Sequence, residues 1–160
     1  MFNIVLLEPE IPQNTGNIAR TCGATGATLH LIEPMGFSID EKHVRRAGLD
    51  YWHLVTIKTY KNIEEFYSKN KGTFYYVSTK SEKTYCDVEF KEDDYFIFGK
   101  ETKGIPEDIL IKNRDMCIRI PMDEEARSLN LSNSVAIVIY EALRQTGFAN
   151  LKKSGDLFKE

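Results

Sequence analysis

The stretch Pro12–Arg20 combines an asparagine, a glycine and an arginine at a spacing that could bind a phosphate. Asn14 and Gly16 form a turn signal, and Asn14 could cap a helix that follows. Arg20 would lie further into that helix, where its guanidinium could act with the helix N-terminus on an anion. The alternative is a capped helix with a solvated arginine, which a lone Asn-x-Gly turn favours when taken by itself.

A second loop, Phe98–Pro106, places Glu101 between Gly99 and Gly104. Glycines let the backbone approach a ligand closely. The loop contains neither Gly-x-Gly-x-x-Gly nor a Walker sequence, so the usual nucleotide fingerprints are absent. By itself, the loop predicts a turn with a surface carboxylate.

A third loop, Arg127–Asn133, carries hydroxyl and amide side chains just before a long apolar helix pattern. A capping run is the simplest interpretation, with Ser132 as the expected cap. That assignment leaves Ser128 and Asn130 without a structural role.

The elements that must position these loops alternate along the chain. Apolar and β-branched runs predict strands, and capped amphipathic runs predict helices. The expected strands are 2–7, 28–32, 53–59, 73–78, 95–98 and 117–120; the expected helices are 16–24, a short one capped by Asn62, 107–112 and 132–144. This order predicts an α/β fold with a mostly parallel sheet and helices on both faces. Ligands of such sheets bind in loops beyond the carboxyl ends of the strands.

Composition sets the class of protein. The 160 residues, 42% hydrophobic and 28% charged, are typical of one globular domain, 1–160, with a fraying tail at 150–160. Lys plus Arg total 21 and Asp plus Glu total 24, so the net charge of −3 excludes nucleic-acid binding through overall basic charge and leaves only local patches. Cys22, Cys86 and Cys117 form no Cys-x-x-Cys pair, so no disulfide framework or zinc site is indicated. With no bilayer-length apolar run and no basic leader, we expect a reduced, cytoplasmic protein without membrane contact.

The histidines do not form a nucleophile constellation with the serines or cysteines. His30 lies within an expected strand, where a packed residue is the favoured interpretation over a base. His43 lies in the charged segment Asp40–Arg46, for which a solvated helix face and a phosphate-binding cluster are equally favoured.

The three loops, in this order, resemble motifs of the SPOUT superfamily of knotted methyltransferases. The first resembles Asn-x-Gly-x-x-x-Arg, the second Phe-Gly-x-Glu-x-x-Gly and the third Ser-Leu-Asn-x-Ser followed by the last helix. Within the superfamily, the stretches Glu8–Pro12, Ile32–Phe37 and Arg45–Tyr51 resemble the small tRNA (cytidine/uridine-2'-O-)methyltransferases. The resemblance runs from Met1 to about Phe148.

The resemblance implies a trefoil knot over about 75–147, a homodimer and S-adenosylmethionine as methyl donor. The helix 132–144 and the first helix are the implied dimer surfaces. Carried onto this sequence, the family's cofactor contacts fall at Val77, Gly99, Ile120, Ser128 and Leu129.

The implied reaction is attack of a ribose 2'-hydroxyl on the donor methyl, which needs alignment and no metal. Arg20 matches the family's catalytic position. Because arginine stays protonated, we expect it to bind the adjacent phosphate and stabilise the developing alkoxide. Tyr140 could position the nucleotide, with core packing slightly favoured. The remaining assignments are Asn14 holding the first loop, Glu101 anchoring the second or lying near the cofactor, and Ser128 and Asn130 shaping the pocket and guiding the hydroxyl.

The implied substrate is the wobble nucleotide of leucine tRNAs. Tyr51 and Trp52 could stack on a flipped base, or could belong to the core. The expected electrostatic footprint on RNA is Arg20, Lys42, Arg45, Arg46, Arg127 and Arg144.

Three alternatives stay open. The same fold could act on ribosomal RNA, although the expected single domain favours tRNA. The protein could be a non-catalytic, dimeric RNA-binding module, which the presence of the motif residues disfavours. An open doubly wound nucleotide enzyme would need a phosphate-binding glycine run, for which residues 14–17 are a poor match.

Overall fold

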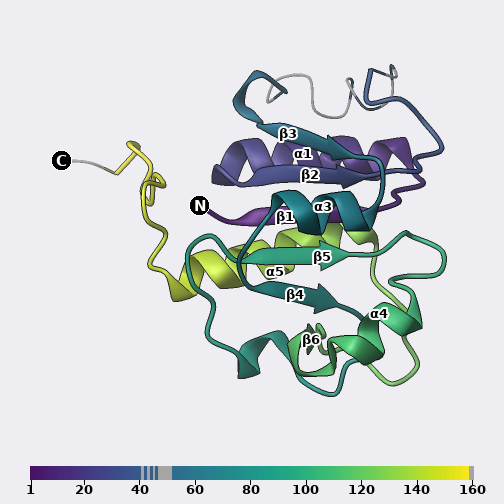
Figure 1. Cartoon of the computed structure of the whole chain (residues 1–160). Helices are drawn as coiled ribbons and strands as arrows, with labels where there is room; N and C mark the ends of the chain where they lie inside the picture. The colour runs from purple at the N-terminus through teal and green to yellow at the C-terminus, as the bar shows by residue number, and fades with distance from the viewer. Residues whose placement is uncertain (41, 43, 45, 47–51, 159–160) are drawn as a thin grey trace.

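The computed structural model describes residues 1–40, 42, 44, 46 and 52–158. Its described strands form one parallel sheet in the order β3-β2-β1-β5-β4-β6, and the arrows of Figure 1 accordingly share one direction. The strands are β1 (Asn3–Leu7), β2 (Thr28–Ile32), β3 (Ile57–Tyr60), β4 (Phe74–Val77), β5 (Tyr95–Phe98) and β6 (Cys117–Ile118). The order differs from the doubly wound order 3-2-1-4-5-6 in the exchange of β4 and β5, which disfavours that alternative.

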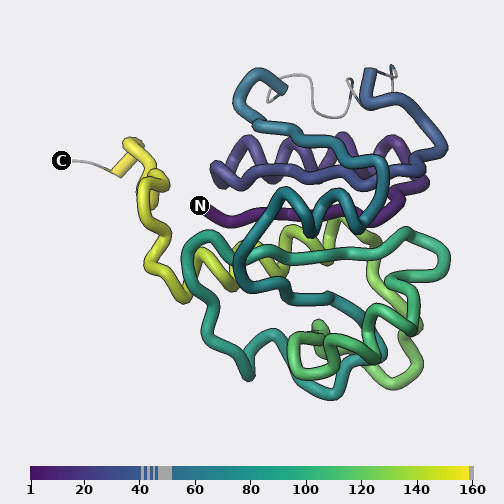
Figure 2. Tube along the Cα trace, viewed as in Figure 1, coloured from purple at the N-terminus to yellow at the C-terminus, as the bar shows by residue number. Residues whose placement is uncertain are grey.

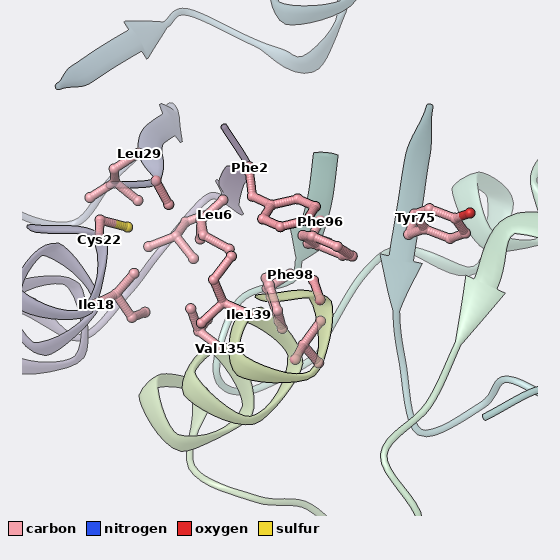
Figure 3. Packing of buried hydrophobic residues seen from close by; sticks show 14 of the residues in the cluster. Phe2, Leu6, Ile18, Cys22, Leu29, Tyr75, Phe96, Phe98, Val135 and Ile139 are labelled. Carbon is pink, nitrogen blue, oxygen red and sulfur yellow. The ribbon is translucent and has the colours of Figure 1, made fainter. Parts of the chain in front are cut away.

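Helices cover both faces of the sheet, as the sequence predicts. The α-helices whose bounds lie within the described residues are α1 (Pro12–Thr25), α3 (Ile63–Lys69), α4 (Glu107–Lys112) and α5 (Leu131–Gln145), and short 3-10 turns are η1 (Trp52–Leu54), η2 (Tyr85–Asp87) and η3 (Arg114–Met116). Figure 3 shows Ile18 of α1 and Ile139 of α5 packing with Leu6 and Phe96 on one face. On the other face, Phe66 of α3 packs with the alternate strand residues.

The central strands are buried on both faces because parallel strands lie between two helical layers. Every residue of β5 is buried, and so are Ile4–Leu7 of β1. Their register places Val5 between His30 and Ile97. These continuous apolar runs are why the sequence predicted both strands at nearly their observed bounds.

Helix α1 begins at Pro12, four residues before the expected start at Gly16. Ile11 occupies the N-cap position and supplies no side-chain cap, while Pro12 suits the first turn because its missing N–H would find no partner there. Asn14 therefore lies inside the first turn, and the prediction that it caps the helix is wrong. The helix ends at Gly26, whose φ of 77° suits glycine.

Helix α5 begins at Leu131, and its N-cap is Asn130 rather than Ser132. The Asn130 side-chain oxygen accepts hydrogen bonds from the backbone N–H groups of Ser132 and Asn133, at 2.9 and 3.4 Å. The expectation that Ser132 caps is wrong, and Asn130 does have a structural role. The predicted cap of α3 is confirmed, because Asn62 accepts from the Glu65 N–H at 2.8 Å.

Two strands are shorter than expected because their neighbours end. β2 pairs with β3 from Leu29↔Ile57 onward, so residues 53–56 lie beyond the ladder and 52–54 form η1 instead. β4 ends at Val77, opposite Ile118, so β6 does not continue to residue 120. Arg119 instead makes an isolated bridge to Thr84.

Residues 152–158 lie apart from the sheet in Figure 2 and contain no helix or strand. Leu157 and Phe158 are exposed there. Across the described residues, no helix combines the length and apolarity needed to cross a membrane.

His30 is the packed residue that the sequence favoured. Its ring is 1% exposed and hydrogen-bonded to the Tyr60 hydroxyl at 2.9 Å and the Asn3 side-chain oxygen at 3.0 Å. Burial, with a smaller contribution from the charge of Lys58, lowers the pKa of His30 to about 4. The ring therefore stays neutral at physiological pH within the core.

Candidate active site

The three loops singled out in the sequence meet around one cavity of about 570 Å³ beyond the carboxyl ends of β4 and β5. That volume lies in the range of small-molecule sites, roughly 300–1,000 Å³. Most of the predicted site residues line it: Asn14, Val77, Gly99, Glu101, Ile120, Arg127, Ser128, Leu129 and Asn130. All the expected cofactor contacts are thus neighbours, and their roles stay predictions.

The loop after β5 is folded tightly on itself, which explains its glycines. Lys100 and Gly104 form an isolated antiparallel bridge, and the Gly104 N–H donates to the Lys100 carbonyl at 3.0 Å. A Cβ at Gly99 would overlap the backbone of Gly104 and Ile105. Gly104 has a φ of 67°, a conformation that favours glycine. Residues 99–104 of this compact loop all line the cavity.

Glu101 uses its carboxylate to begin α1. Its oxygens accept from the backbone N–H groups of Glu10 at 2.8 Å and Ile11 at 3.0 Å, and from the Asn14 side-chain amide at 3.4 Å. An anion at a helix N-terminus is favourable because unpaired amides and the helix dipole both point at it. The sequence expectation that Glu101 anchors its loop therefore has a direct structural counterpart.

Asn14 connects this carboxylate to the third loop. The Asn130 side-chain amide donates to the Asn14 side-chain oxygen at 3.1 Å, while Asn130 also caps α5. Asn14 is 6% exposed, so its amide is held in a largely buried position. A continuous chain of hydrogen bonds thus joins all three loops through Glu101, Asn14 and Asn130.

The cavity rim is rich in cations. Lys80 is paired with Glu107 and Lys100 with Glu8, each at 2.7 Å. Lys103 and Arg127 also line the cavity, and neither makes an ion pair with a described residue. The described residues contain no cluster of His, Cys, Asp and Glu suited to a metal ion.

Arg20 does not line this cavity. It follows Asn14 by six residues on α1, so it lies about 9 Å further along the helix axis and faces another side. Its side chain is exposed. One chain alone therefore does not bring Arg20 to the loops with which the sequence associated it.

Tyr140 is also outside the cavity. It is 46% exposed on α5, near the exposed Ile137 one turn earlier, so the core-packing interpretation is wrong for this chain on its own. Trp52, by contrast, is half-buried and packs against the main core cluster, which favours its core interpretation. Tyr51 lies outside the described residues.

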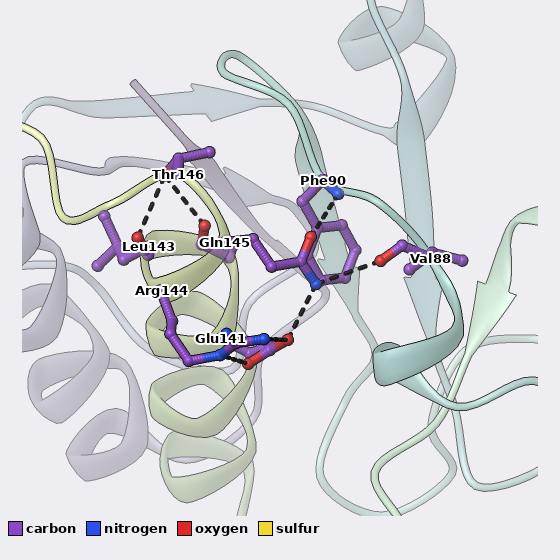
Figure 4. Close-up of polar contacts among 8 residues, drawn as sticks. Val88, Phe90, Glu141, Leu143, Arg144, Gln145 and Thr146 are labelled. Atoms are coloured by element: carbon purple, nitrogen blue, oxygen red, sulfur yellow. Dashed lines mark hydrogen bonds and ion pairs between the residues drawn. The ribbon is translucent and has the colours of Figure 1, made fainter.

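The expected RNA footprint divides into separate places. Arg127 lies at the cavity, whereas Arg144 forms a two-point ion pair with Glu141, at 2.8 and 3.0 Å, which also lowers the pKa of Glu141 (Figure 4). Lys42 and Arg46 are exposed residues with helical backbone. Arg45 and His43 lie outside the described residues.

Several lining residues were not predicted. They come from the segment after β4, from the lysines of the glycine loop, from the segment after β6 and from the start of α5: Ser78, Thr79, Lys80, Lys100, Lys103, Met122 and Ser134. The lysines between Gly99 and Gly104 carried a usable signal, because a loop predicted to enclose a ligand must present some of its own side chains.

A parallel α/β sheet with a cavity formed by the loops at its carboxyl edge has the architecture of a ligand-binding α/β protein. The model of the SpoU rRNA Methylase family matches residues 1–140, and the chain therefore belongs to that family. This match confirms the SPOUT resemblance, and the parallel sheet confirms the α/β fold predicted from the order of strands and helices.

Described methyltransferases are similar to this chain over more than nine-tenths of its length. A tRNA (cytidine(34)-2'-O)-methyltransferase of Saccharophagus degradans is 49% identical over 154 residues, covering 95% of this chain and 100% of the relative. A solved structure described by "Structural insights into the 2-OH methylation of C/U34 on tRNA" is 40% identical with a TM-score of 0.88, covering 92% of this chain and 97% of that one. The methyltransferase AviRb of Streptomyces viridochromogenes, solved with AdoMet, shares the fold at 24% identity and a TM-score of 0.77, over 94% of this chain and 58% of that one.

Proposed function

We propose that this protein transfers a methyl group from S-adenosylmethionine to the ribose 2'-hydroxyl of nucleotide 34, the wobble position, in tRNA. The observation that carries the proposal is the single cavity formed by the three methyltransferase-like loops. Near-complete coverage by a relative and a solved structure described with this activity supports it. A tRNA substrate would place the protein in the cytoplasm.

The residues of the cavity fit the methyl donor. Val77, Ile120 and Leu129 offer apolar surface to an adenine ring, and the folded backbone at Gly99 allows close approach. Lys103 and Arg127 can face a carboxylate. When bound, S-adenosylmethionine supplies an activated methyl group, which is why the reaction needs no resident metal.

We assign Arg20 to the substrate rather than to the donor. A guanidinium is a bidentate phosphate ligand and stays protonated, so it can hold the phosphate beside the target ribose and stabilise negative charge on the 2'-oxygen. We propose that Ser128 and Asn130, which line the cavity, orient the hydroxyl. This division of roles requires Arg20 to reach a cavity other than its own chain's.

A homodimer meets that requirement. Helices α1 and α5 pack against each other, and α5 exposes Ile137 and Tyr140. Exposed apolar side chains on α5, next to α1, suit an isologous interface with a second copy. We propose that this interface carries Arg20 of one chain to the cavity of its partner, with Tyr140 near the joint.

The finer assignments follow the resemblance. We propose leucine tRNAs as the substrates, one domain over 1–160, and a knot over about 75–147 that encloses the donor. With a net charge of −3, tRNA must be bound through local cations such as Lys42, Arg46 and Arg127.

The decisive experiment is transfer of a radiolabelled methyl group to purified tRNA, comparing the wild type with Arg20→Ala. We expect label in a 2'-O-methylated nucleotide 34 of leucine tRNA, and loss of that label in the variant. Label in ribosomal RNA instead would move the proposal to that substrate. Absence of donor binding would leave the non-catalytic RNA-binding alternative.

Salt dependence tests the electrostatic footprint separately. Because binding to phosphates releases counterions, we expect tRNA affinity to fall steeply and linearly in a plot of log K against log salt. Filter binding between about 50 and 200 mM salt measures the slope. A flat response would contradict a footprint made of lysines and arginines.

A further inference from the structure

The segment after β1 and the glycine loop exchange side chains in both directions. Glu101 of the loop accepts from the backbone of residues 10 and 11. In return, Glu10 accepts from Thr102, at 2.7 Å from the hydroxyl and 3.2 Å from the backbone N–H. Glu8 adds an ion pair with Lys100 at 2.7 Å, with both side chains about three-quarters buried. The contacts thus form a reciprocal clamp.

The carboxylates of the clamp contact the loop without lining the cavity. Residues 99–104 all line the cavity, whereas Glu8 and Glu10 do not. Glu10 is an exposed carboxylate within the stretch Glu8–Pro12, to which the sequence assigned no role in the site. The bonds from Thr102, joined by the charges of Lys100 and Lys103, lower the pKa of Glu10, so the carboxylate is charged at neutral pH.

The backbone of Glu8, the first residue of the clamp, is also unusual. Glu8 has a φ of 51°, a left-handed conformation that a glutamate adopts at some cost. Glycine adopts this conformation without the same cost, but it has no side chain that could pair with Lys100. The ion pair with Lys100 is therefore a reason for a glutamate at a position where the backbone conformation favours glycine.

We propose that Glu10 is a positioning residue for methyl-donor binding, acting through Thr102 to hold the loop 99–104 in the shape that lines the cavity. This inference rests on the proposed function, because it assigns the cavity to S-adenosylmethionine. An exposed glutamate usually contributes little. Here Glu101 has already brought the two segments together, so the additional bonds of Glu10 cost little further entropy.

The test measures donor binding without RNA. We expect Glu10→Ala to weaken S-adenosylmethionine binding by calorimetry about three- to ten-fold, as expected for lost hydrogen bonds. Amide hydrogen exchange of the ligand-free protein should speed up at Thr102 and its neighbours and stay unchanged in α5. At saturating donor, kcat should be nearly unaffected, since the loop is then held by the ligand.

Matched variants separate positioning from general stability. Glu10→Gln keeps a side-chain oxygen for Thr102 and should recover most of the donor affinity. Thr102→Val removes the hydroxyl partner, and the double variant with Glu10→Ala should lose less than the sum of both single losses. Glu89→Ala removes an exposed loop glutamate away from the cavity and should change neither donor affinity nor exchange at residues 99–104.

The outcomes distinguish this inference from the proposed function. Unchanged donor affinity and amide exchange in Glu10→Ala would overturn the inference and leave the methyltransferase proposal intact. Weakened S-adenosylmethionine binding in Glu10→Ala, with unchanged binding in Glu89→Ala, would support the inference even if tRNA accepted no label. A wild-type protein that does not bind S-adenosylmethionine would overturn both.

Discussion

Glu101 serves two elements with one carboxylate. It belongs to the loop that lines the cavity, and its oxygens accept the backbone N–H groups of Glu10 and Ile11 where α1 begins. Because α1 has no side-chain cap of its own, this residue couples the stability of the helix to the shape of the loop.

Replacing Glu101 by alanine should therefore affect folding as well as activity. We expect Glu101→Ala to lower the free energy of unfolding by about 1–2 kcal/mol, the usual cost of a lost helix cap. Glu101→Gln should cost less, because the amide oxygen can still accept one of the hydrogen bonds. Urea unfolding measures both; equal stability of Glu101→Ala and the wild type would contradict the capping role.

His30 makes stability depend on pH. Its pKa is about 4 in the folded protein and 6.5 for the unperturbed side chain, so below pH 6.5 the unfolded chain binds a proton that the native state does not. The stabilisation is present above pH 6.5 and is lost as the pH falls towards 4, by at most about 3 kcal/mol. Unfolding of His30→Gln across this range should show a flatter pH profile, and an unchanged slope would count against His30.

At the scale of elements, the sequence predicted the periodic segments and the starts of α3 and α4, and misplaced the starts of α1 and α5. Buried strands such as β1 and β5 have apolar runs that local patterning detects. Pro12 was a local signal for the start of α1 that the prediction did not use, whereas the capping carboxylate of Glu101 lies about 90 residues away in sequence. For α5 the local signal was ambiguous, since Asn130 and Ser132 are both good capping residues.

The start of α5 can be tested by separating the two functions of Asn130. Asn130→Ala should destabilise the protein by about 1 kcal/mol, through loss of the cap. Asn130→Asp keeps an oxygen that accepts from the helix amides but loses the N–H group that donates to Asn14. The variant should therefore retain most of the stability while S-adenosylmethionine binding weakens. Ser132→Ala should cost less than Asn130→Ala; the reverse order would restore Ser132 as the main cap.

At the scale of the whole molecule, the sequence motifs identified a cavity but not its complete chemistry. The predicted donor contacts converge because the carboxyl ends of parallel strands lie along one edge of the sheet. Arg20 shares a motif with Asn14 yet faces another side of α1. The proposed homodimer would account for the positions of Arg20 and Tyr140, and sequence spacing within one chain cannot reveal such a partner.

A mixed dimer tests that assembly directly. Gly99→Ala should close the donor cavity of its own chain, because the added Cβ overlaps the backbone of Gly104 and Ile105, while leaving its Arg20 intact. Each homodimer, Gly99→Ala or Arg20→Ala, should be inactive. A doubly tagged heterodimer should recover about half of the wild-type rate, since one of its two symmetric sites then combines an intact cavity with an intact partner arginine. An inactive heterodimer that still binds donor in its intact cavity would show that Arg20 acts within its own chain, because neither chain then carries both functional groups.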